Sequence, residues 1–371
     1  MMYLKQHNRR CQRGIALIVV MIAVTVLSIM AALFAFSMKV ETRLAQNANS
    51  EMEVMWLGRS GVEMARWILA NDPPPQEGFT SLMQIWAGGP GSPASSNGIL
   101  AGFSYKEPVK LGNGQFQIVK ITELESKFNI NIADQAILDQ AMRLVGVDSG
   151  EAAAVTASIM DWIDPDNSPS PGGGAESEHY QTLEPPYFAK NQPFDDLSEL
   201  LLIRGVTPEM YWGGVSTNRT RAAFQSRMNP NFARDTPQHF VGLVELFTPI
   251  SSGRLNINTA TMTTLQLLPF VDEIVAAKII ELRSGPDGMD GTEDDMPAGA
   301  MGIPIPDVLR SAGLNQNVVQ LAAGYCTARG AAYEVKVDAT IGGYTRKFTA
   351  ILGRVSARDV QVLSFYMTPE E

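Results

Sequence analysis

The sequence has few of the residues that form covalent cross-links or act in acid–base catalysis. Among 371 residues there are two cysteines, Cys11 and Cys326, and three histidines, His7, His179 and His239. It contains no zinc-ligand spacing and no Gly-x-Ser-x-Gly nucleophile elbow. A disulfide-dense miniprotein is therefore excluded, and enzyme chemistry has little support. His179 follows two glutamates, but a surface histidine in an acidic loop is the simpler interpretation.

Basic residues are scarce as well. There are 29 lysines and arginines against 39 acids, a net charge of -10, which argues against general nucleic-acid binding. The first 40 residues reverse this balance, because they contain no acid at all. Their five bases are Lys5, Arg9, Arg10, Arg13 and Lys39, and residues 14–38 carry no charge.

The uncharged run over residues 15–36 is long enough to cross a membrane. As a helix it spans roughly 33 Å, the thickness of a bilayer core. The basic leader should remain cytoplasmic while the following chain crosses. A secretory signal peptide is the alternative, but its apolar core is usually about 7–15 residues long and ends at a small-residue cleavage site. Here the run ends in Phe34-Ala35-Phe36, which favours a retained membrane helix.

The predicted helix continues beyond the membrane. No proline occurs from Lys39 to Ala70, and apolar residues recur there every three or four positions. Asn71-Asp72-Pro73-Pro74-Pro75 then ends the helix. We expect one helix over residues 15–70, roughly 84 Å long, with an apolar first half and an amphipathic second half that packs one face on a globular head.

A short basic leader that ends in Gly14, followed by an uncharged helix, resembles the prepilin-like family. The resemblance implies that a dedicated peptidase cuts between Gly14 and Ile15 and methylates Ile15. Most members have Glu at the fifth mature position, where it neutralises the free amine of a neighbouring subunit; here that residue is Val19. The K-type minor pseudopilin of type II secretion (general secretion pathway protein K) is the member known for this departure, which implies a place at the filament tip.

Strand patterns lie on both sides of a long helical middle. Residues 333–341 and 344–352 alternate around Gly342-Gly343, which predicts a hairpin. Further strands are predicted at 103–106, 114–122 and 360–367. The economical topology is one antiparallel sheet packed on the N-terminal helix, with the middle inserted into it.

The middle contains an internal repeat. Phe128-Asn129-Ile130-Asn131-Ile132-Ala133 returns as Leu255-Asn256-Ile257-Asn258-Thr259-Ala260. A helical pair should follow each copy, with the asparagines capping its first helix, and an acidic turn and another apolar helix come next. The predicted pairs are 134–145 with 149–163 and 261–268 with 271–283, and the acidic turns are 161–167 and 287–295.

The predicted fold is therefore α+β: a long N-terminal transmembrane helix, a pilin-like helix packed on an antiparallel sheet, and a large inserted α-helical domain of two repeated helix-hairpin-helix or SAM-like units. This plan resembles the K-type minor pseudopilin along nearly the whole chain, and that family also contains the Asn-Ile-Asn-Thr-Ala string. The expected boundaries are 1–14 for the cleaved leader, 15–38 for the transmembrane helix, 39–125 and 329–371 for the head, and 126–328 for the inserted domain, with units at about 126–215 and 253–328.

The hairpin of the second unit raises a competing function, that of a membrane-anchored DNA-binding protein in an uptake machine. DNA-binding hairpins have two glycines that let backbone amides approach a phosphate. Here Phe270 and Asp272 occupy those positions, so side-chain bulk and negative charge count against DNA contact. A membrane-anchored hydrolase is a third class, kept because clusters of carboxylates sometimes catalyse.

The acidic turns are the best site candidates. The second combines five acids with three glycines, which suits calcium, although its spacing is not that of an EF-hand. A solvated acidic loop is the alternative, but acidic turns at equivalent places of a repeat favour a metal ion. Because Cys326 is the one cysteine of the mature chain, no disulfide can form within it, and a bound metal could hold the long turns in place instead. The resemblance implies structural calcium held by Asp164, Asp166, Glu176, Asp287, Asp290, Asp294 and Asp295.

These observations predict a structural protein, not an enzyme. The resemblance implies a single-pass inner-membrane protein with a cytoplasmic N-terminus and a periplasmic C-terminal domain, which initiates or caps a pseudopilus for export of folded proteins. It implies other minor pseudopilins, the major pseudopilin and the prepilin peptidase as partners, with the secretin and a secreted substrate as further candidates and no nucleic acid. Predicted interface residues are Val19, Leu44, Met52, Met55 and Val62.

Overall fold

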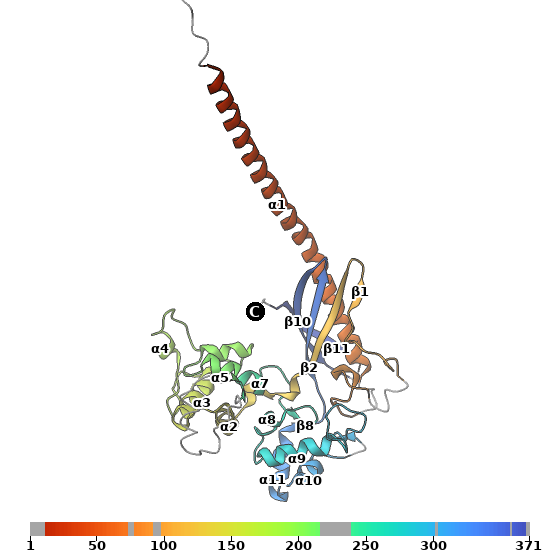
Figure 1. Cartoon of the computed structure of the whole chain (residues 1–371). Helices are drawn as coiled ribbons and strands as arrows, with labels where there is room; N and C mark the ends of the chain where they lie inside the picture. Colours follow the sequence, from red (N-terminus) through yellow and green to blue (C-terminus); the bar gives the residue numbers. More distant parts are fainter. Residues whose placement is uncertain are drawn as a thin grey trace, which may run out of the picture.

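The computed structural model describes residues 12–72, 78–91, 98–215, 239–300, 303–356 and 358–368. A single long helix projects from a globular part in which a sheet and two groups of helices are arranged (Figure 1). Residues 1–11 of the predicted leader lie outside the described residues.

Helix α1 runs from Gln12 to Asn71 and confirms the single helix predicted over 15–70. Its described side chains from Ala16 to Val40 are exposed, and its most apolar stretch has a mean hydropathy of 2.9 with none of it buried. The helix is therefore long and apolar enough to cross a bilayer. At its other end the Arg354 guanidinium donates to the carbonyls of Leu69 and Asp72, which satisfies acceptors that a helix terminus leaves open.

The sheet is antiparallel and has five strands in the order β1-β2-β9-β10-β11. β9 and β10 form the predicted hairpin through Gly342 and Gly343, whose φ angles are 55° and 85°. The strands are β1 (Val109–Leu111), β2 (Gly114–Glu123), β9 (Ala332–Ile341), β10 (Tyr344–Arg354) and β11 (Val360–Met367). Sequence patterns therefore predicted four of the five strands.

The strand predicted at residues 103–106 is wrong. Tyr105 is buried, and its hydroxyl donates to the Trp86 carbonyl at 2.9 Å, while Lys106 Nζ donates to the Gly88 carbonyl at 3.1 Å. These contacts hold the segment against the short 3-10 helix η1 (Ile85–Ala87) instead of a neighbouring strand.

The C-terminal half of α1 packs directly on the sheet. A Cβ added to Gly58 would lie 2.5 Å from the Phe348 ring, and one added to Gly61 would lie 2.5 Å from Val337. Only glycine allows this close an approach of helix to sheet. Val54, Ile68 and their neighbours on the same face of α1 complete a core with β2, β9 and β10.

Two related helical units lie between β2 and β9. A parallel two-residue bridge closes each unit: β3 (Phe128–Asn129) pairs with β6 (Phe247–Thr248), and β7 (Leu255–Asn256) pairs with β8 (Cys326–Thr327). The first unit has η3 (Ile130–Ile132), α2 (Gln135–Val145), α3 (Ser149–Ile163), α4 (Ser177–Tyr180), η4 (Leu197–Leu202), α5 (Pro208–Trp212), a β4 (Gly214–Val215) and β5 (His239–Phe240) pair, and α7 (Leu243–Leu246). The second has α8 (Met262–Leu265), α9 (Glu273–Arg283), α10 (Ile305–Ser311) and α11 (Gln316–Gly324).

The units share one hydrophobic core, which is distinct from that of the head. It runs from Phe128 through Ile137 and Leu255 to Val319. Helices α8 to α11 lie at the end of the molecule opposite to the N-terminal half of α1 (Figure 1). The antiparallel sheet and the apolar N-terminal helix of the predicted fold are thus confirmed, while the domain boundaries stay a prediction.

The asparagines of the repeat do not cap the first helices, so that expectation is wrong. The Asp134 side chain accepts from Ile137 N at the start of α2, and Thr261 accepts from Thr264 N at the start of α8. Asn129 instead caps the short 3-10 helix η3 by accepting from Asn131 N. Asn131, Asn256 and Asn258 contact residues far away in the sequence.

Candidate functional site

Three acidic side chains meet beyond the C-terminal end of α3. Asp164 is the residue at which the helix ends, Asp166 follows in the turn, and Glu176 precedes α4. Each contributes one carboxylate oxygen to a group in which these atoms all lie within 4.8 Å of one another. The structure thus brings together the three ligands predicted for the first acidic turn.

Three oxygens of this group have no protein donor, whereas Asp166 Oδ1 accepts from Ser168 N at 2.7 Å. Asp164 Oδ1 and both carboxylate oxygens of Glu176 are buried without a hydrogen-bond partner, and Glu176 is 3% exposed. Burying such oxygens without compensation is costly. A cation that prefers several oxygen ligands in loose geometry, as calcium does, would satisfy them. The residues present therefore fit the predicted ion.

The surroundings of the group also favour a positive charge. Burial, followed by the negative charges of Asp161, Asp164 and Asp166, raises the pKa of Glu176 to about 7. Burial and the charges of Asp166 and Asp161 raise the pKa of Asp164. Both shifts mean that protonation relieves repulsion when no other cation is present.

Asp161 supports this group, although the predicted ligand set did not include it. It is fully buried on α3, and both of its oxygens accept from Ser170 N, at 3.0 and 3.2 Å. This contact folds the turn back towards α3 and brings Glu176 near Asp164. The signal available in the sequence was the Asp161-x-x-Asp164 spacing, which places both residues on one face of a helix. His179 is not a member of the acidic group.

The second acidic turn has a different internal arrangement. Arg283 is 6% exposed and forms a bidentate ion pair with Asp290, with N–O distances of 2.9 and 2.6 Å. The same guanidinium donates to the carbonyls of Ile257 and Ala260. It ties the turn to the start of the second unit without a metal.

The other predicted ligands of this turn accept hydrogen bonds within it. Asp294 accepts from Asp287 N and Thr292 Oγ1, Asp295 accepts from Gly291 N, and Asp287 accepts from Met289 N. Among the described residues, Asp287, Asp290, Asp294 and Asp295 do not form a group of three or more mutually close ligand atoms. Calcium in this turn stays a prediction.

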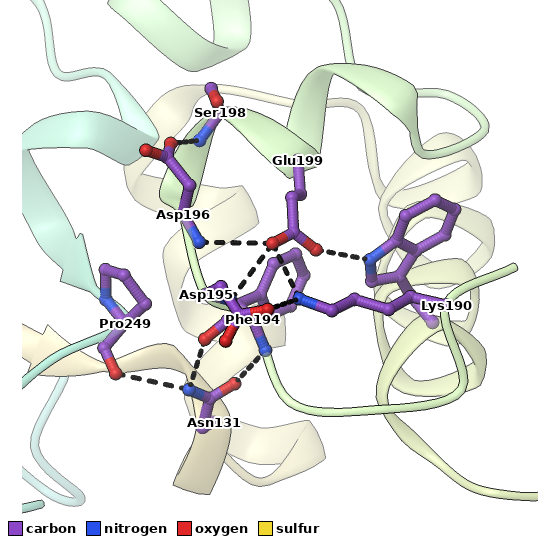
Figure 2. Close-up of polar contacts among 9 residues, drawn as sticks. Asn131, Lys190, Phe194, Asp195, Asp196, Ser198, Glu199 and Pro249 are labelled. Carbon is purple, nitrogen blue, oxygen red and sulfur yellow. Dashed lines mark hydrogen bonds and ion pairs between the residues drawn. The ribbon is translucent and has the colours of Figure 1, made fainter.

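The repeated asparagines hold each unit together. Asn131 donates to the carbonyls of Phe194 and Pro249 and accepts from Phe194 N at 2.7 Å (Figure 2). In the second unit, Asn258 donates to the Thr80 and Ala298 carbonyls and accepts from Ala298 N at 2.8 Å. The two asparagines therefore join the start of each unit to a later loop in the same way.

Lys190 extends this network in the first unit. Its ammonium lies 2.7 Å from both Asp195 and Glu199, and Glu199 also accepts from the backbone N–H groups of Asp195 and Asp196 (Figure 2). The indole of Trp162, on α3, donates to the other oxygen of Glu199 at 3.2 Å. These contacts anchor the segment after the acidic turn on the helix that carries Asp161.

A buried polar cluster joins the head to the second unit. Glu123, at the end of β2, accepts from Thr80 Oγ1 at 3.0 Å and from Asn256 Nδ2 at 2.8 Å. Burial and then the charge of Glu125 raise the pKa of Glu123 to about 7, against the opposing effect of its hydrogen bonds. Glu125 accepts from Ser252 N and from the N–H groups of Ala331 and Ala332. Sequence patterns gave no sign of this acidic pair.

The predicted interface residues on α1 fall into two groups. Val19, Leu44 and Met52 are 58, 62 and 60% exposed, and Met55 is partly buried against the head core. Val62 is 3% exposed and belongs to that core. The prediction that Val62 lies in an interface with another protein is therefore wrong, because the face of α1 that carries Val62 packs on the chain's own sheet.

The predicted processing residues lie inside α1. The helix continues through Gly14 and Ile15 without interruption, and the surroundings of these two residues are outside what the structure describes.

Comparison with known proteins gives a consistent result. Residues 115–212 match the family model described as type II secretion system (T2SS), protein K. The resemblance to the type II secretion system protein K family is confirmed. Proteins of that name from Aeromonas hydrophila and Pectobacterium carotovorum subsp. carotovorum are 25 and 26% identical over 54 and 55% of this chain. The matched region spans 61% of the length of each of these proteins K.

Two further comparisons cover more of the chain. The type II secretion system protein K of Pseudomonas aeruginosa is 25% identical over 77% of this chain and 76% of its own. A chain in the crystal structure of the GspK-GspI-GspJ complex from the enterotoxigenic Escherichia coli type 2 secretion system has a TM-score of 0.59 at 16% identity. It covers 88% of this chain and 99% of its own length. At that identity the similarity shows a shared fold.

Proposed function

We propose that this chain is a minor pseudopilin of a type II secretion system. The observation that carries the proposal is the construction of α1: its residues 16–38 are uncharged and exposed, and its C-terminal half packs on the sheet as part of the head core. Such a helix anchors in a membrane and presents a folded head on one side of it. The match to protein K relatives and to a chain of the GspK-GspI-GspJ complex supports this role.

The proposed topology follows from charge and helix length. The basic leader is cytoplasmic, α1 crosses the inner membrane once, and the head and helical units are periplasmic. A prepilin peptidase removes the leader after Gly14 and methylates Ile15. The exposed stripe of Leu44 and Met52 on α1 is the surface for other minor pseudopilins, by analogy with the complex in which the structural neighbour was solved.

We place the subunit at the tip of the pseudopilus. Val19 lies where an acid would neutralise the N-terminus of an adjacent subunit, and the helical units add bulk at the end of the molecule away from the membrane (Figure 1). In this position the subunit initiates or caps a filament, built otherwise of the major pseudopilin, that drives folded proteins towards the secretin.

A Val19→Glu variant tests the tip position. In cells that lack the wild-type gene, pseudopili should contain the variant along the shaft, because the missing acid is restored. Immunogold labelling locates the subunit, and Leu17→Glu, which places an acid on a different face of the helix, is the control. Secretion that is unaffected by deletion of the gene would refute the proposed function itself.

We further propose that Asp164, Asp166 and Glu176 hold a structural calcium ion. The ion would supply the positive charge that these buried oxygens lack and would tie the end of α3 to the start of α4. The support is the set of unpartnered oxygens in Asp164 and Glu176.

A further inference from the structure

The two helical units contain the same hairpin between their paired helices. Gly146-Val147-Asp148 joins α2 to α3, and Phe270-Val271-Asp272 leads into α9. In each hairpin the valine is buried and the aspartate is the residue before the next helix. The first residue of each has a left-handed backbone, with φ of 83° at Gly146 and 66° at Phe270.

The residues at the two tips are nevertheless opposite in kind. Gly146 suits the left-handed conformation, whereas a bulky side chain is strained in it. Phe270 is 62% exposed, so its ring gives little to the core in return. Four residues further on, the first unit has Gly150 and the second has Ile274, which is 78% exposed.

The first unit therefore acts as an internal control. It makes the same hairpin with no side chain at either position, so the fold requires neither the phenylalanine nor the isoleucine. Phe270 lies two residues before the N-cap of α9 and Ile274 lies in its first turn, so both exposed apolar side chains belong to the same end of the hairpin. A strained backbone that presents exposed apolar groups is typical of a binding surface.

The charge and the place of this end of the hairpin restrict what binds it. Asp272 and Glu273 lie between the two apolar residues in the sequence and are exposed, which disfavours nucleic acid and anionic lipid. The α8–α11 group lies at the end of the molecule away from the membrane half of α1 (Figure 1). The complementary surface is thus an apolar pocket with a rim of lysine or arginine on a protein.

We propose that Phe270 and Ile274 form a docking knob that enters an apolar, basic-rimmed pocket on a protein partner. The aromatic ring is the anchor, and the left-handed backbone holds it away from the core. Only the export measurement below rests on the proposed function.

Photo-crosslinking of the full-length chain in living cells tests the contact. p-Benzoylphenylalanine replaces Phe270, Ile274 or, as a control, Leu321, which is 52% exposed on α11 of the same unit. We expect the same protein adduct from positions 270 and 274 and none from 321. Glu273→Lys should reduce the adduct several-fold by placing a base against the basic rim. An adduct only with lipid or with a second copy, an equal adduct from 321, or no effect of Glu273→Lys overturns the proposal.

The Phe270→Gly variant separates docking from folding, because it restores the residue of the first unit. Its melting temperature should be no lower than that of the parent, while the adduct from position 274 and export of folded protein both fall at least several-fold. Leu321→Ala should leave both unchanged. A clear fall in melting temperature, or an unchanged adduct, contradicts the proposal. If deleting the whole gene leaves export intact, the proposed function fails, but the crosslinking results still decide the docking knob.

Discussion

Two buried glutamates with the same raised pKa have different surroundings. Glu123 and Glu176 both reach a pKa of about 7. Hydrogen bonds from Thr80 and Asn256 satisfy Glu123, whereas both oxygens of Glu176 are buried without a donor. A buried carboxyl group whose hydrogen bonds are satisfied links parts of the fold, and its titration makes stability depend on pH. A buried carboxyl group that lacks donors and lies among other acids is a candidate metal ligand.

Glu123 should make stability depend on pH. Because its folded pKa is raised, the stability that it contributes is present below its unfolded pKa, 4.5, and is lost as the pH rises through about 7. We expect the free energy of unfolding of wild type relative to Glu123→Gln to fall by about 3 kcal/mol between pH 4.5 and 8. Urea unfolding of both full-length chains in detergent at several pH values measures this difference. Parallel pH profiles would show that Glu123 does not titrate in this window.

Glu176 should make stability depend on calcium. At a hundredfold excess of ion over its dissociation constant, binding adds about 2.7 kcal/mol, or roughly 3–4 °C in melting temperature for a chain of 371 residues. Chelator should remove this gain from wild type, and Glu176→Gln should abolish it. Asp294→Asn, in the second turn, is the matched control and should respond as wild type does. If Asp294→Asn loses the response while Glu176→Gln keeps it, the ion binds in the second turn.

At the scale of elements, local patterns predicted what local chemistry determines. Helix α1 ends at Asn71, two residues before Pro73, and the hairpin of β9 and β10 follows from Gly342-Gly343, because both signals act within a few residues. Residues 103–106 show the reverse case. Their alternation resembled a strand, but the Tyr105 hydroxyl and the Lys106 ammonium bond to the turn at 86–88. A contact of that range leaves no periodic signal in the sequence.

The acidic turns show the same limit at the candidate site. Their composition is similar, and each follows the second helix of a predicted pair, α3 or α9. What distinguishes them is Arg283, which pairs with Asp290 across the end of α9 and supplies the second turn with a cation of its own. The first turn has no such base among its described contacts, so Asp164 Oδ1 and both oxygens of Glu176 stay buried without a donor. Composition predicts that acids gather, but only packing determines which of them already have a partner.

At the scale of the whole molecule, the helical units lie between two neighbouring strand ends, β2 and β9. Glu123 and Tyr333 are cross-strand partners in β2 and β9, so the chain leaves and re-enters the sheet at neighbouring positions. The head has a hydrophobic core of its own, made by α1 and the sheet. A two-residue Asp-Gly turn in place of residues 125–331 should therefore close β2 onto β9 as a hairpin.

This shortened chain separates the two features that could determine the tip position. We expect it to keep a cooperatively unfolding head, at lower stability because the contacts of Thr80 with Asn256 are lost, and to show no response to calcium. In cells it still carries Val19. If it stays at the tip, the missing acid on α1 decides the position; if it enters the shaft, the bulk of the helical units does. Immunogold labelling of the shortened chain and of the Val19→Glu variant in the same assay tests both the missing acid and the bulk of the helical units. A chain that no longer folds would refute the independence of the head, because its core would then depend on the insertion.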